Sequence, residues 1–580
     1  MYILGVKPSL GLADVFRFWG VHDGGACLIK NGDIVAAVQE ERFTREKRAK
    51  NTFPSESVEF VLDREGIDLS DVDAVAIGRD PKRKISYYRN RIREDPLSAI
   101  PTSKKEALDA LEEAKTAVAA LNDVHTYRVE QELADLDCGE FDGAFHTVAH
   151  HRSHATSACY CAPFDRPITI TIDGRGEDDS TVLWDESLNR VKEFSKENSI
   201  GLLYSYATQY LGFRHGGDAG KVMGLAPYGE RRPAFKRAFQ SILTFGDGEY
   251  DVTSITAASD PISVFEEHFG PRRIHPEEFT QRHRDFAYHL QKTTEEIVLD
   301  LVEHHVKAQG NRNVALAGGV AMNCKLNREI LELDCVDDVF IQPAADDAGI
   351  CLGAALDVEN KLGDGTPNPE FTNVYFGPEY DNAEIEKCLE NAKLEYEQPD
   401  DIAAEVAELL ADGNLVGWFQ GRMEFGSRAL GNRSILADPT DEASLDRVNK
   451  NVKHREAWRP FAPSLLYEAK EEYLEGGEEA PFMILLDTVK EDKRDKIPAV
   501  THVDNTTRPQ TVREEVNPKY YRMIDEFGER TGTPVVLNTS FNVAGEPIVE
   551  SPAQAVADFY STGLDALAIG DYLLLKPGVR

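Results

Sequence analysis

The sequence has few cysteines and no pair of them in a CxxC arrangement. Eight scattered cysteines in 580 residues fit reduced thiols better than a disulfide framework or a zinc ribbon. The sequence also lacks a run of apolar residues long enough to span a bilayer, and its start lacks the basic and apolar regions of a secretory signal. We therefore expect a cytoplasmic protein without a membrane span, with Cys27, Cys159, Cys161 and Cys351 in its core.

Positive charge is also in deficit relative to negative charge. The chain has 64 Lys and Arg against 101 Asp and Glu, which gives a formal net charge of −37. This charge disfavours nucleic acid and anionic membranes as partners. An acidic shell is typical of proteins adapted to high intracellular salt, and an ordinary acidic protein is the alternative. Unfolding on dialysis into low salt would distinguish the two.

The apolar segments predict an α/β protein. Strands are expected at the N-terminus and on both sides of a turn at Asn31-Gly32, and helical periodicity follows in residues 55–66 and 104–135. A later apolar strand ends at Asp173 in a glycine-rich turn. The segment NVALAGGVAMNCKLN runs again from a strand through glycines into a helix.

A change of composition divides the chain. Residues 361–381 are dense in Gly, Pro, Asn and Asp, which is typical of a linker. Because 580 residues exceed one ordinary core, we predict two domains, residues 1–370 and 371–580. Strands expected in NLVGWFQ and TPVVLNTSFNVAGEPIV make the second domain another α/β unit.

Three histidines lie in the segment VAHHRSHATSACY, residues 148–160. His150 and His154 would share one face of a helix and could bind one metal ion, whereas His151 would point elsewhere. Ordinary hydrogen-bonded helix histidines are the alternative.

Carboxylates that could complete such a site are Asp173, at a strand end, and Asp346 and Asp347 in QPAADDAGICLGAA. Two imidazoles and two carboxylates suit Fe(II), Mn(II) or Zn(II), and the sequence does not choose among these metals. Either Asp346 or Asp347 could instead cap the helix that follows them.

Glycine-rich turns follow several expected strands, at Gly24-Gly25, at Gly174 and Gly176 in the segment DGRG, and at Gly318-Gly319. Unhindered backbone N–H groups at such positions can approach phosphate oxygens, so together the three turns indicate a divided nucleotide site. Ordinary tight turns are the alternative for each of them, and none matches the P-loop or GxGxxG pattern.

Arginines are concentrated in GRMEFGSRALGNRS, which contains Arg422, Arg428 and Arg433. Further basic residues follow in NVKHREAWRPFAPS and TTRPQTV. In so acidic a chain this concentration indicates an internal pocket for an anion, because guanidinium groups match phosphate oxygens bidentately. Salt bridges to the abundant carboxylates are the alternative.

Seven segments occur in the order expected for one family: HDGGACLIKNGDIVAAVQEERFTREK, HHRSHATSACY, GDAGKVMGLAPYG, LAGGVAMNCKLN, GRMEFGSRALGNRSILADP, WRPFAPS and LNTSFNVAGEPIV. They resemble the NodU/CmcH family of O-carbamoyltransferases over nearly the whole chain. The resemblance implies an N-terminal domain of the actin/sugar-kinase (ASKHA) ATPase class and a C-terminal YrdC-like domain. It also implies an ATP-dependent enzyme that makes carbamoyl-adenylate from carbamoyl phosphate and transfers the carbamoyl group to a hydroxyl of a small molecule or glycan.

The resemblance assigns roles to individual N-terminal residues. His150, His154, Asp173 and Asp346 fall on the metal positions of the family, with iron as the expected metal and Mg²⁺ accompanying ATP. Lys47, Gly174, Gly318, Gly319 and Asn323 resemble the N-terminal nucleotide site. His22 resembles a histidine near the transfer centre and could act as the general base for the acceptor hydroxyl.

In the C-terminal domain the resemblance assigns carbamoyl phosphate and ATP binding to Arg428, Lys453, Arg459, Arg508 and Ser540. Two departures from the family pattern are present: FGSRALG stands where FGPRALG is usual, and HHRSHA stands where HHLAHA is usual. The first makes the loop before Arg428 less constrained. Neither departure removes an expected ligand.

Other functions fit part of the pattern. Carbamoyl transfer in hydrogenase maturation would require acylphosphatase and zinc-finger modules that the sequence lacks, and threonylcarbamoyl transfer to tRNA would require a basic surface. An actin-like ATP-binding switch without transfer activity would not need the second anion pocket. The acceptor is not apparent from the sequence, and a homodimer is compatible with the resemblance.

Overall fold

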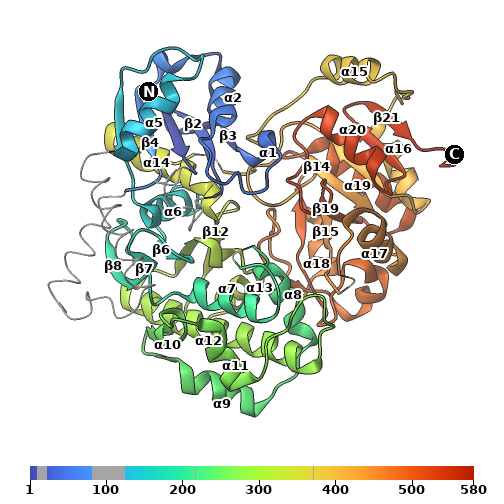
Figure 1. Cartoon of the computed structure of the whole chain (residues 1–580). Coiled ribbons are helices and arrows are strands. Elements are labelled where there is room, and N and C mark those ends of the chain that lie inside the picture. Colours follow the sequence, from blue (N-terminus) through green and yellow to red (C-terminus); the bar gives the residue numbers. More distant parts are fainter. Residues whose placement is uncertain (10–21, 81–123, 216, 370, 457, 580) are drawn as a thin grey trace.

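The computed structural model describes residues 1–9, 22–80, 124–215, 217–369, 371–456 and 458–579. These residues form three sheets of five or more strands with helices packed against them, which confirms the predicted α/β class (Figure 1). The part of the predicted helical region 104–135 that is described contains α5 (Val124–Ala134). No described helix combines the length and apolar character needed to cross a membrane.

The first sheet has the order β3-β2-β1-β4-β5. Its first three strands are antiparallel neighbours, and β4 and β5 continue parallel to β1. The predicted turn at Asn31-Gly32 is confirmed, with φ of 52° and 90°, the left-handed values that a two-residue hairpin turn requires. The strands are β1 (Tyr2–Lys7), β2 (Gly25–Lys30), β3 (Asp33–Gln39), β4 (Ala74–Ile77) and β5 (Ala144–Thr147).

The second sheet repeats this topology in the order β12-β11-β6-β7-β8. Here β6, β7 and β8 are antiparallel neighbours, and β11 and β12 continue parallel to β6. Two units with the same strand order confirm the predicted actin/sugar-kinase-like architecture. The strands are β6 (Ile168–Ile172), β7 (Asp179–Trp184), β8 (Arg190–Ser195), β11 (Asn313–Ala317) and β12 (Asp338–Ile341).

Helices cover both sheets and separate them. On the first sheet, α2 (Ser55–Glu65) packs against β2 and β3, and α14 (Ile350–Leu362) packs against β1, β2 and β4. On the second sheet, α6 (His150–Cys159) packs against β6 and β11. The lower lobe in Figure 1 contains α7 (Ile200–Tyr210), α8 (Ala219–Leu225), α9 (Pro233–Ile242), α10 (Thr253–Thr256), α11 (Pro261–Phe269), α12 (Gln281–Gln309) and α13 (Cys324–Leu331).

The third sheet is mixed and has the order β18-β15-β19-β14-β13-β20-β21. It confirms the second predicted α/β unit, including the strands expected in NLVGWFQ and TPVVLNTSFNVAGEPIV. The strands are β13 (Val416–Phe419), β14 (Arg433–Ala437), β15 (Ala462–Leu466), β18 (Gln510–Val512), β19 (Val535–Ser540), β20 (Ala566–Ile569) and β21 (Tyr572–Leu575). Its helices include α15 (Asn382–Asn391), α16 (Ile402–Ala411), α17 (Glu442–Val448), α19 (Pro518–Thr531) and α20 (Pro552–Ser561).

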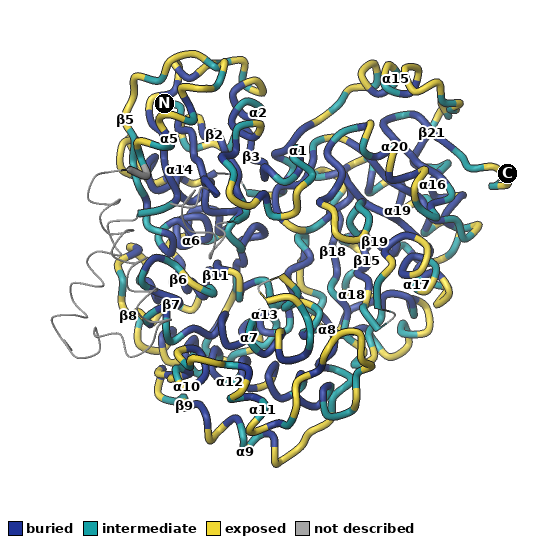
Figure 2. The backbone as a smooth tube through the Cα atoms, in the orientation of Figure 1, coloured by how far each residue is buried: buried dark blue, intermediate teal, exposed yellow. Residues whose placement is uncertain are grey.

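Buried apolar residues pack against each of the three sheets. Two of the cores in the N-terminal part also contain residues from beyond residue 370. Figure 2 shows buried backbone along the central strands and exposed backbone on outer elements such as α15. Phe376 and Phe425 pack into the core around α14, and Ile484 packs into the core of the second sheet. The division at residue 370, which itself lies outside the described residues, stays a prediction. The four cysteines predicted to be in the core are buried, and all eight cysteines are free.

Helices α6 and α14 approach each other unusually closely at Gly353. A Cβ atom at this position would lie 1.7 Å from the carbonyl oxygen of Ser153, and the Thr156 hydroxyl donates to the Gly353 carbonyl at 2.6 Å. Only glycine allows this contact, so Gly353 determines how α6 sits against α14.

We expect Gly353→Ala to lower the free energy of unfolding by about 1–3 kcal/mol, because the added methyl group forces α6 and α14 apart. Urea denaturation followed by circular dichroism measures this change. Gly365→Ala is the matched control, since a Cβ atom there meets no atom within 4 Å. Equal stability of the two variants would contradict this interpretation of the helix contact.

Candidate functional site

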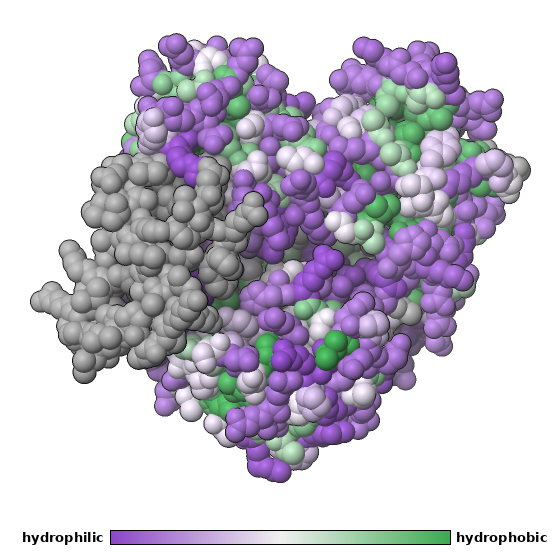
Figure 3. Space-filling model, viewed as in Figure 1, coloured by the Kyte–Doolittle hydropathy of each residue, from purple (hydrophilic) through white to green (hydrophobic). Residues whose placement is uncertain are grey.

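A cavity of about 880 Å³ is lined by residues from the parts of the chain that carry all three sheets. In Figure 3 the hollow near the centre of the visible face is bordered mainly by hydrophilic residues. The predicted site residues that line it are His22, Lys47, Asp173, Gly174, Gly319, Asn323, Asp346, Arg428, Arg459, Arg508 and Ser540. His150, His154, Gly318 and Lys453 are not among its lining residues.

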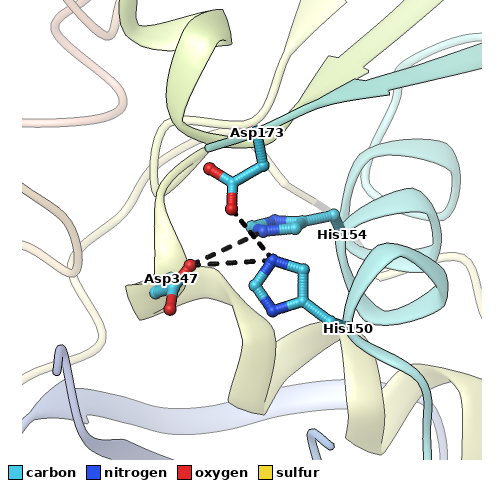
Figure 4. A group of neighbouring side chains, drawn as sticks. All are labelled: His150, His154, Asp173 and Asp347. Atoms are coloured by element: carbon cyan, nitrogen blue, oxygen red, sulfur yellow. Dashed lines mark hydrogen bonds and ion pairs between the residues drawn. The ribbon is translucent and has the colours of Figure 1, made fainter. Parts of the chain in front are cut away.

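Two histidines and two carboxylates form a compact group beside this cavity. His150 and His154 project from one face of α6, Asp173 directly follows β6, and Asp347 begins a short 3-10 helix (Figure 4). One potential ligand atom from each residue can be chosen such that all four lie within 4.8 Å of one another. His150 Nε2 is 3.1 Å from Asp173 Oδ2, and Asp347 Oδ1 is 3.8 Å from Nε2 of both histidines.

In the structure the fourth member of this group is Asp347, whereas the family resemblance named Asp346 and the residues alone left the choice open. Asp346 caps the 3-10 helix that follows it, and its side chain accepts a hydrogen bond from the Ala348 backbone N–H at 3.1 Å. Burial and the nearby Asp23 raise the pKa of Asp346 to about 7. Adjacent residues at a helix start point in different directions, so only one of the two aspartates joins the histidines.

The group fits a metal ion because one imidazole has no other partner. The His154 side chain is fully buried, and neither of its ring nitrogens makes a hydrogen bond to a described residue. Burial and the neighbouring His150 lower the pKa of His154 to about 4, which favours the neutral form that binds metals. Burial disfavours the charged form of His150 too, but Asp347 and Asp173 raise its pKa to about 9.

Neighbouring groups hold α6 in place. The Glu177 carboxylate accepts the backbone N–H of His150, the first residue of the helix, at 3.1 Å. His151 is directed to Thr171 Oγ1 and the Asp179 carbonyl, at 3.0 and 3.2 Å. The expectation that His151 points away from the pair is therefore confirmed.

The glycines after β11 act through packing and backbone hydrogen bonds. Gly318 has φ of 94°, and a Cβ atom there would lie 2.3 Å from the Ile172 carbonyl. Its N–H donates to the Ala345 carbonyl, and the Gly319 N–H donates to Asp173 Oδ1 at 2.9 Å. Both N–H groups are thus engaged within the protein, and the open position is Gly174, where a Cβ atom would meet nothing within 4 Å.

The C-terminal wall of the cavity is a cluster of positive side chains, the arginine cluster Arg428, Arg455, Arg459 and Arg508. Burial and the nearby Arg508 lower the pKa of Arg428 to about 9, and burial with Arg459 and Arg508 has the same effect on Arg455. These values are above neutral, so the groups stay charged. Arg428 Nε is buried and makes no hydrogen bond to a described residue. Like charges held together in this way create a site for an anion.

Lys453, expected among the anion ligands, supports the neighbouring loop instead. Its ammonium group donates to Ser540 Oγ at 3.3 Å and to the Asn542 carbonyl and Oδ1 at 3.0 and 2.9 Å. The residue is buried. Ser540, which does line the cavity, is thereby held beside the arginine cluster.

Two arginines of the segment GRMEFGSRALGNRS have structural contacts outside the cavity. Arg422 donates to the carbonyls of Val35 and Phe376 at 3.0 and 2.7 Å. Arg433 is fully buried, donates to backbone carbonyls and lies over the Phe419 ring at 3.7 Å. The predicted clustering of three arginines in one anion pocket is therefore wrong for these two, because their guanidinium groups donate to backbone carbonyls outside the cavity.

On the N-terminal side, His22 belongs to a charged group that the sequence expectations did not include. His22 Nδ1 lies 2.6 Å from Asp23 Oδ2, and Arg48 contacts both residues. Burial lowers the pKa of the neighbouring Lys47, which also lines the cavity. The position of Asp23 directly after His22 was the available signal for this pair. Arg455 was also missed, although it lies in the basic segment NVKHREAWRPFAPS.

Comparisons with known proteins cover most of the chain. Residues 11–356 match the family model Carbamoyltransferase N-terminus, and residues 407–576 match Carbamoyltransferase C-terminus. The nodulation protein NolNO of Sinorhizobium fredii is 38% identical, covering 98% of this chain and 81% of that protein. The 3'-hydroxymethylcephem-O-carbamoyltransferase of Amycolatopsis lactamdurans is 34% identical, covering 44% of this chain and 47% of that protein. Component A of (R)-2-hydroxyglutaryl-CoA dehydratase from Acidaminococcus fermentans, a solved structure, has a TM-score of 0.32 at 16% identity and covers 61% of this chain and 96% of its own.

We expect Asp347→Asn to lower the metal content of the purified protein at least tenfold, because the substitution removes a carboxylate from the group around His154. Asp346→Asn is the matched control, since an asparagine can still cap the 3-10 helix and does not touch the histidines. Plasma mass spectrometry of the dialysed proteins gives the metal content per chain. Metal loss in the Asp346 variant alone would contradict the assignment to Asp347.

Proposed function

The chain belongs to the carbamoyltransferase family, and we propose that it transfers a carbamoyl group from carbamoyl phosphate to a hydroxyl of a small molecule or glycan, using ATP. The cephem relative is named an O-carbamoyltransferase of a hydroxymethyl compound, which supports a hydroxyl acceptor. The observation that carries the proposal is the arginine cluster, which lines the same cavity as His22 and Asp173. One cavity can thus receive an anionic donor and the acceptor together.

In the first proposed half-reaction, water attacks the carbamoyl carbon of carbamoyl phosphate, and phosphate leaves with its bridging oxygen. A carbamate oxygen then attacks the α-phosphorus of ATP, and the bond to the β-phosphate oxygen breaks to release pyrophosphate. Both steps concentrate negative charge on phosphate oxygens. Arg428, Arg459 and Arg508 would stabilise this charge, and Lys453 would act by holding Ser540 beside them.

In the second proposed half-reaction, the acceptor oxygen attacks the carbamoyl carbon of carbamoyl-adenylate, and AMP leaves. The hydroxyl proton goes to a general base, which we assign to His22. Asp23, 2.6 Å from the Nδ1 atom of His22, would stabilise the imidazolium that forms. Lys47, Gly174, Gly319 and Asn323 would bind the nucleotide phosphates or sugar from the N-terminal side of the cavity.

A divalent metal is part of the proposal, held by His150, His154, Asp173 and Asp347. We propose Fe(II), with Mn(II) or Zn(II) also compatible with this set of ligands, and Mg²⁺ accompanying ATP. When bound, such a metal supplies a Lewis acid that can polarise a phosphate or carbamoyl oxygen. Two of the four residues, Asp173 and Asp347, line the cavity, and Asp173 also accepts the Gly319 N–H.

The proposed activation step predicts that the protein releases pyrophosphate from ATP only when carbamoyl phosphate is present, even without an acceptor. The measurement is a coupled pyrophosphate assay on metal-loaded protein, carried out in high salt to screen the net charge of −37. The same assay without carbamoyl phosphate is the control, because pyrophosphate released there would come from a contaminating enzyme or from uncoupled cleavage of ATP at its α-phosphate. ATP binding without any release from folded protein would favour an ATP-binding switch over this proposal.

Arg428→Gln should lower kcat/KM for pyrophosphate release about 100-fold, because the remaining charges would no longer surround the phosphates. Arg530→Gln is the control: Arg530 lies on α19 and forms a surface pair with Glu526, so its loss removes one positive charge away from the cavity. Steady-state kinetics at several carbamoyl phosphate concentrations compares the variants. Similar kcat/KM values for both would remove Arg428 from the proposed anion site.

A further inference from the structure

A short segment of the N-terminal part reaches the loop that carries Arg428. We call residues 39–48 the seam segment. It begins with Gln39, the last residue of β3, and contains α1 (Glu41–Thr44), which lies between the two upper lobes in Figure 1. Lys47 and Arg48, at its end, line the cavity. The segment therefore contacts both the cavity and the C-terminal part.

Two side chains of the seam segment bind both backbone polar groups of Gly426. Arg42 Nη2 donates to the Gly426 carbonyl at 2.7 Å and to Gln39 Oε1 at 2.6 Å. Gln39 Oε1 also accepts the Gly426 N–H at 3.3 Å. Arg42 and Gln39 are both buried. Three hydrogen bonds thus close a ring that holds Gly426, a residue of the opposite part of the chain, at both its N–H and its carbonyl group.

Gly426 lies two residues before Arg428, and the position of Arg428 depends on this backbone. Gly426 has φ of 117°, a conformation that other residues rarely adopt. Ser427 is exposed, and Arg428 Nε makes no hydrogen bond to a described residue. Arg508 repels Arg428 and the charge of Asp346 attracts it, but Arg428 forms no hydrogen bond or ion pair with a described residue that would hold it in the cluster before a ligand binds. The loop backbone must supply that restraint.

We propose that Gln39 and Arg42 are positioning residues for the anion site: by holding Gly426 they keep Arg428 within the arginine cluster. Arg42 would then contribute to the activation step from the N-terminal part of the chain without touching the substrates of that step. This inference rests on the proposed role of Arg428 in binding carbamoyl phosphate or ATP phosphates. It adds to that role a dependence on contacts from a distant part of the sequence.

Arg45 offers a matched control because it crosses the same seam to a different loop. Its guanidinium donates to the carbonyls of Pro547 and Ile548 at 3.0 and 2.8 Å and pairs with Glu546. Within the described part of the chain, Arg45 makes no hydrogen bond or ion pair with the Gly426 loop. Loss of Arg45 thus removes a seam contact of the same chemical type without releasing Arg428.

The test is a double-mutant cycle between Arg42→Met and Arg428→Gln in the full chain. We expect Arg42→Met to lower kcat/KM for carbamoyl-phosphate-dependent pyrophosphate release at least tenfold, mainly through KM, and Arg42→Lys to restore part of the loss. The double variant should be no worse than Arg428→Gln alone, because both changes remove the same interaction. If Arg45→Met lowers kcat/KM, the double variant with Arg428→Gln should instead show the product of the two fold-losses in kcat/KM. Calorimetric titration with inorganic pyrophosphate should give the same pattern in Kd.

Thermal unfolding of each variant identifies a folding defect, and if Arg42→Met does not fold, Gln39→Met replaces it in the cycle. Wild-type KM and pyrophosphate affinity in a folded Arg42 variant, or losses that multiply with Arg428→Gln, would overturn the inference. Unchanged kinetics and affinity in Arg428→Gln itself would instead count against the proposed function. The two failures are therefore distinguishable.

Discussion

Mutual repulsion among the arginines around the cavity is the constraint that the surrounding structure must satisfy. The four arginines are partly buried, and apart from Arg459, which lies 3.9 Å from Glu456, they form no ion pair with a described carboxylate. Holding such charges together costs free energy, which a bound anion can recover. Before an anion binds, other contacts must hold the arginines in place. Arg455 donates to Asn449 Oδ1 and lies over the Phe461 ring at 4.2 Å, while Arg428 depends on its loop. The arrangement therefore favours an anion at the expense of local stability.

The opposite charge is gathered on the N-terminal side of the same cavity. Asp23, Asp173, Asp346 and Asp347 line it, and the two histidines lie behind them. A cation would be attracted to these aspartates and an anion to the arginine cluster, while Lys47 and Arg48 add positive charge to the N-terminal side as well.

Local patterns in the sequence were sufficient for the features that depend on neighbouring residues. The hairpin at Asn31-Gly32 and the shared helix face of His150 and His154 follow from backbone geometry alone. The choice between Asp346 and Asp347 depends on one turn, and the sequence left it open. Arg422 and Arg428 look alike in sequence, yet only tertiary contacts decide that one meets backbone carbonyls and the other a cavity.

The contacts across the seam have a chemistry suited to an acidic chain. Arg42, Arg45 and Arg422 each cross between the parts of the chain and donate to backbone carbonyls, of Gly426, of Pro547 and Ile548, and of Val35. A carbonyl cannot be protonated at ordinary pH, and its hydrogen bond is less sensitive to salt than an exposed ion pair. Carboxylates in the same places would add to a net charge of −37. Basic residues thus join the two parts through carbonyl oxygens as well as through ion pairs such as Arg45–Glu546 and Lys325–Asp504.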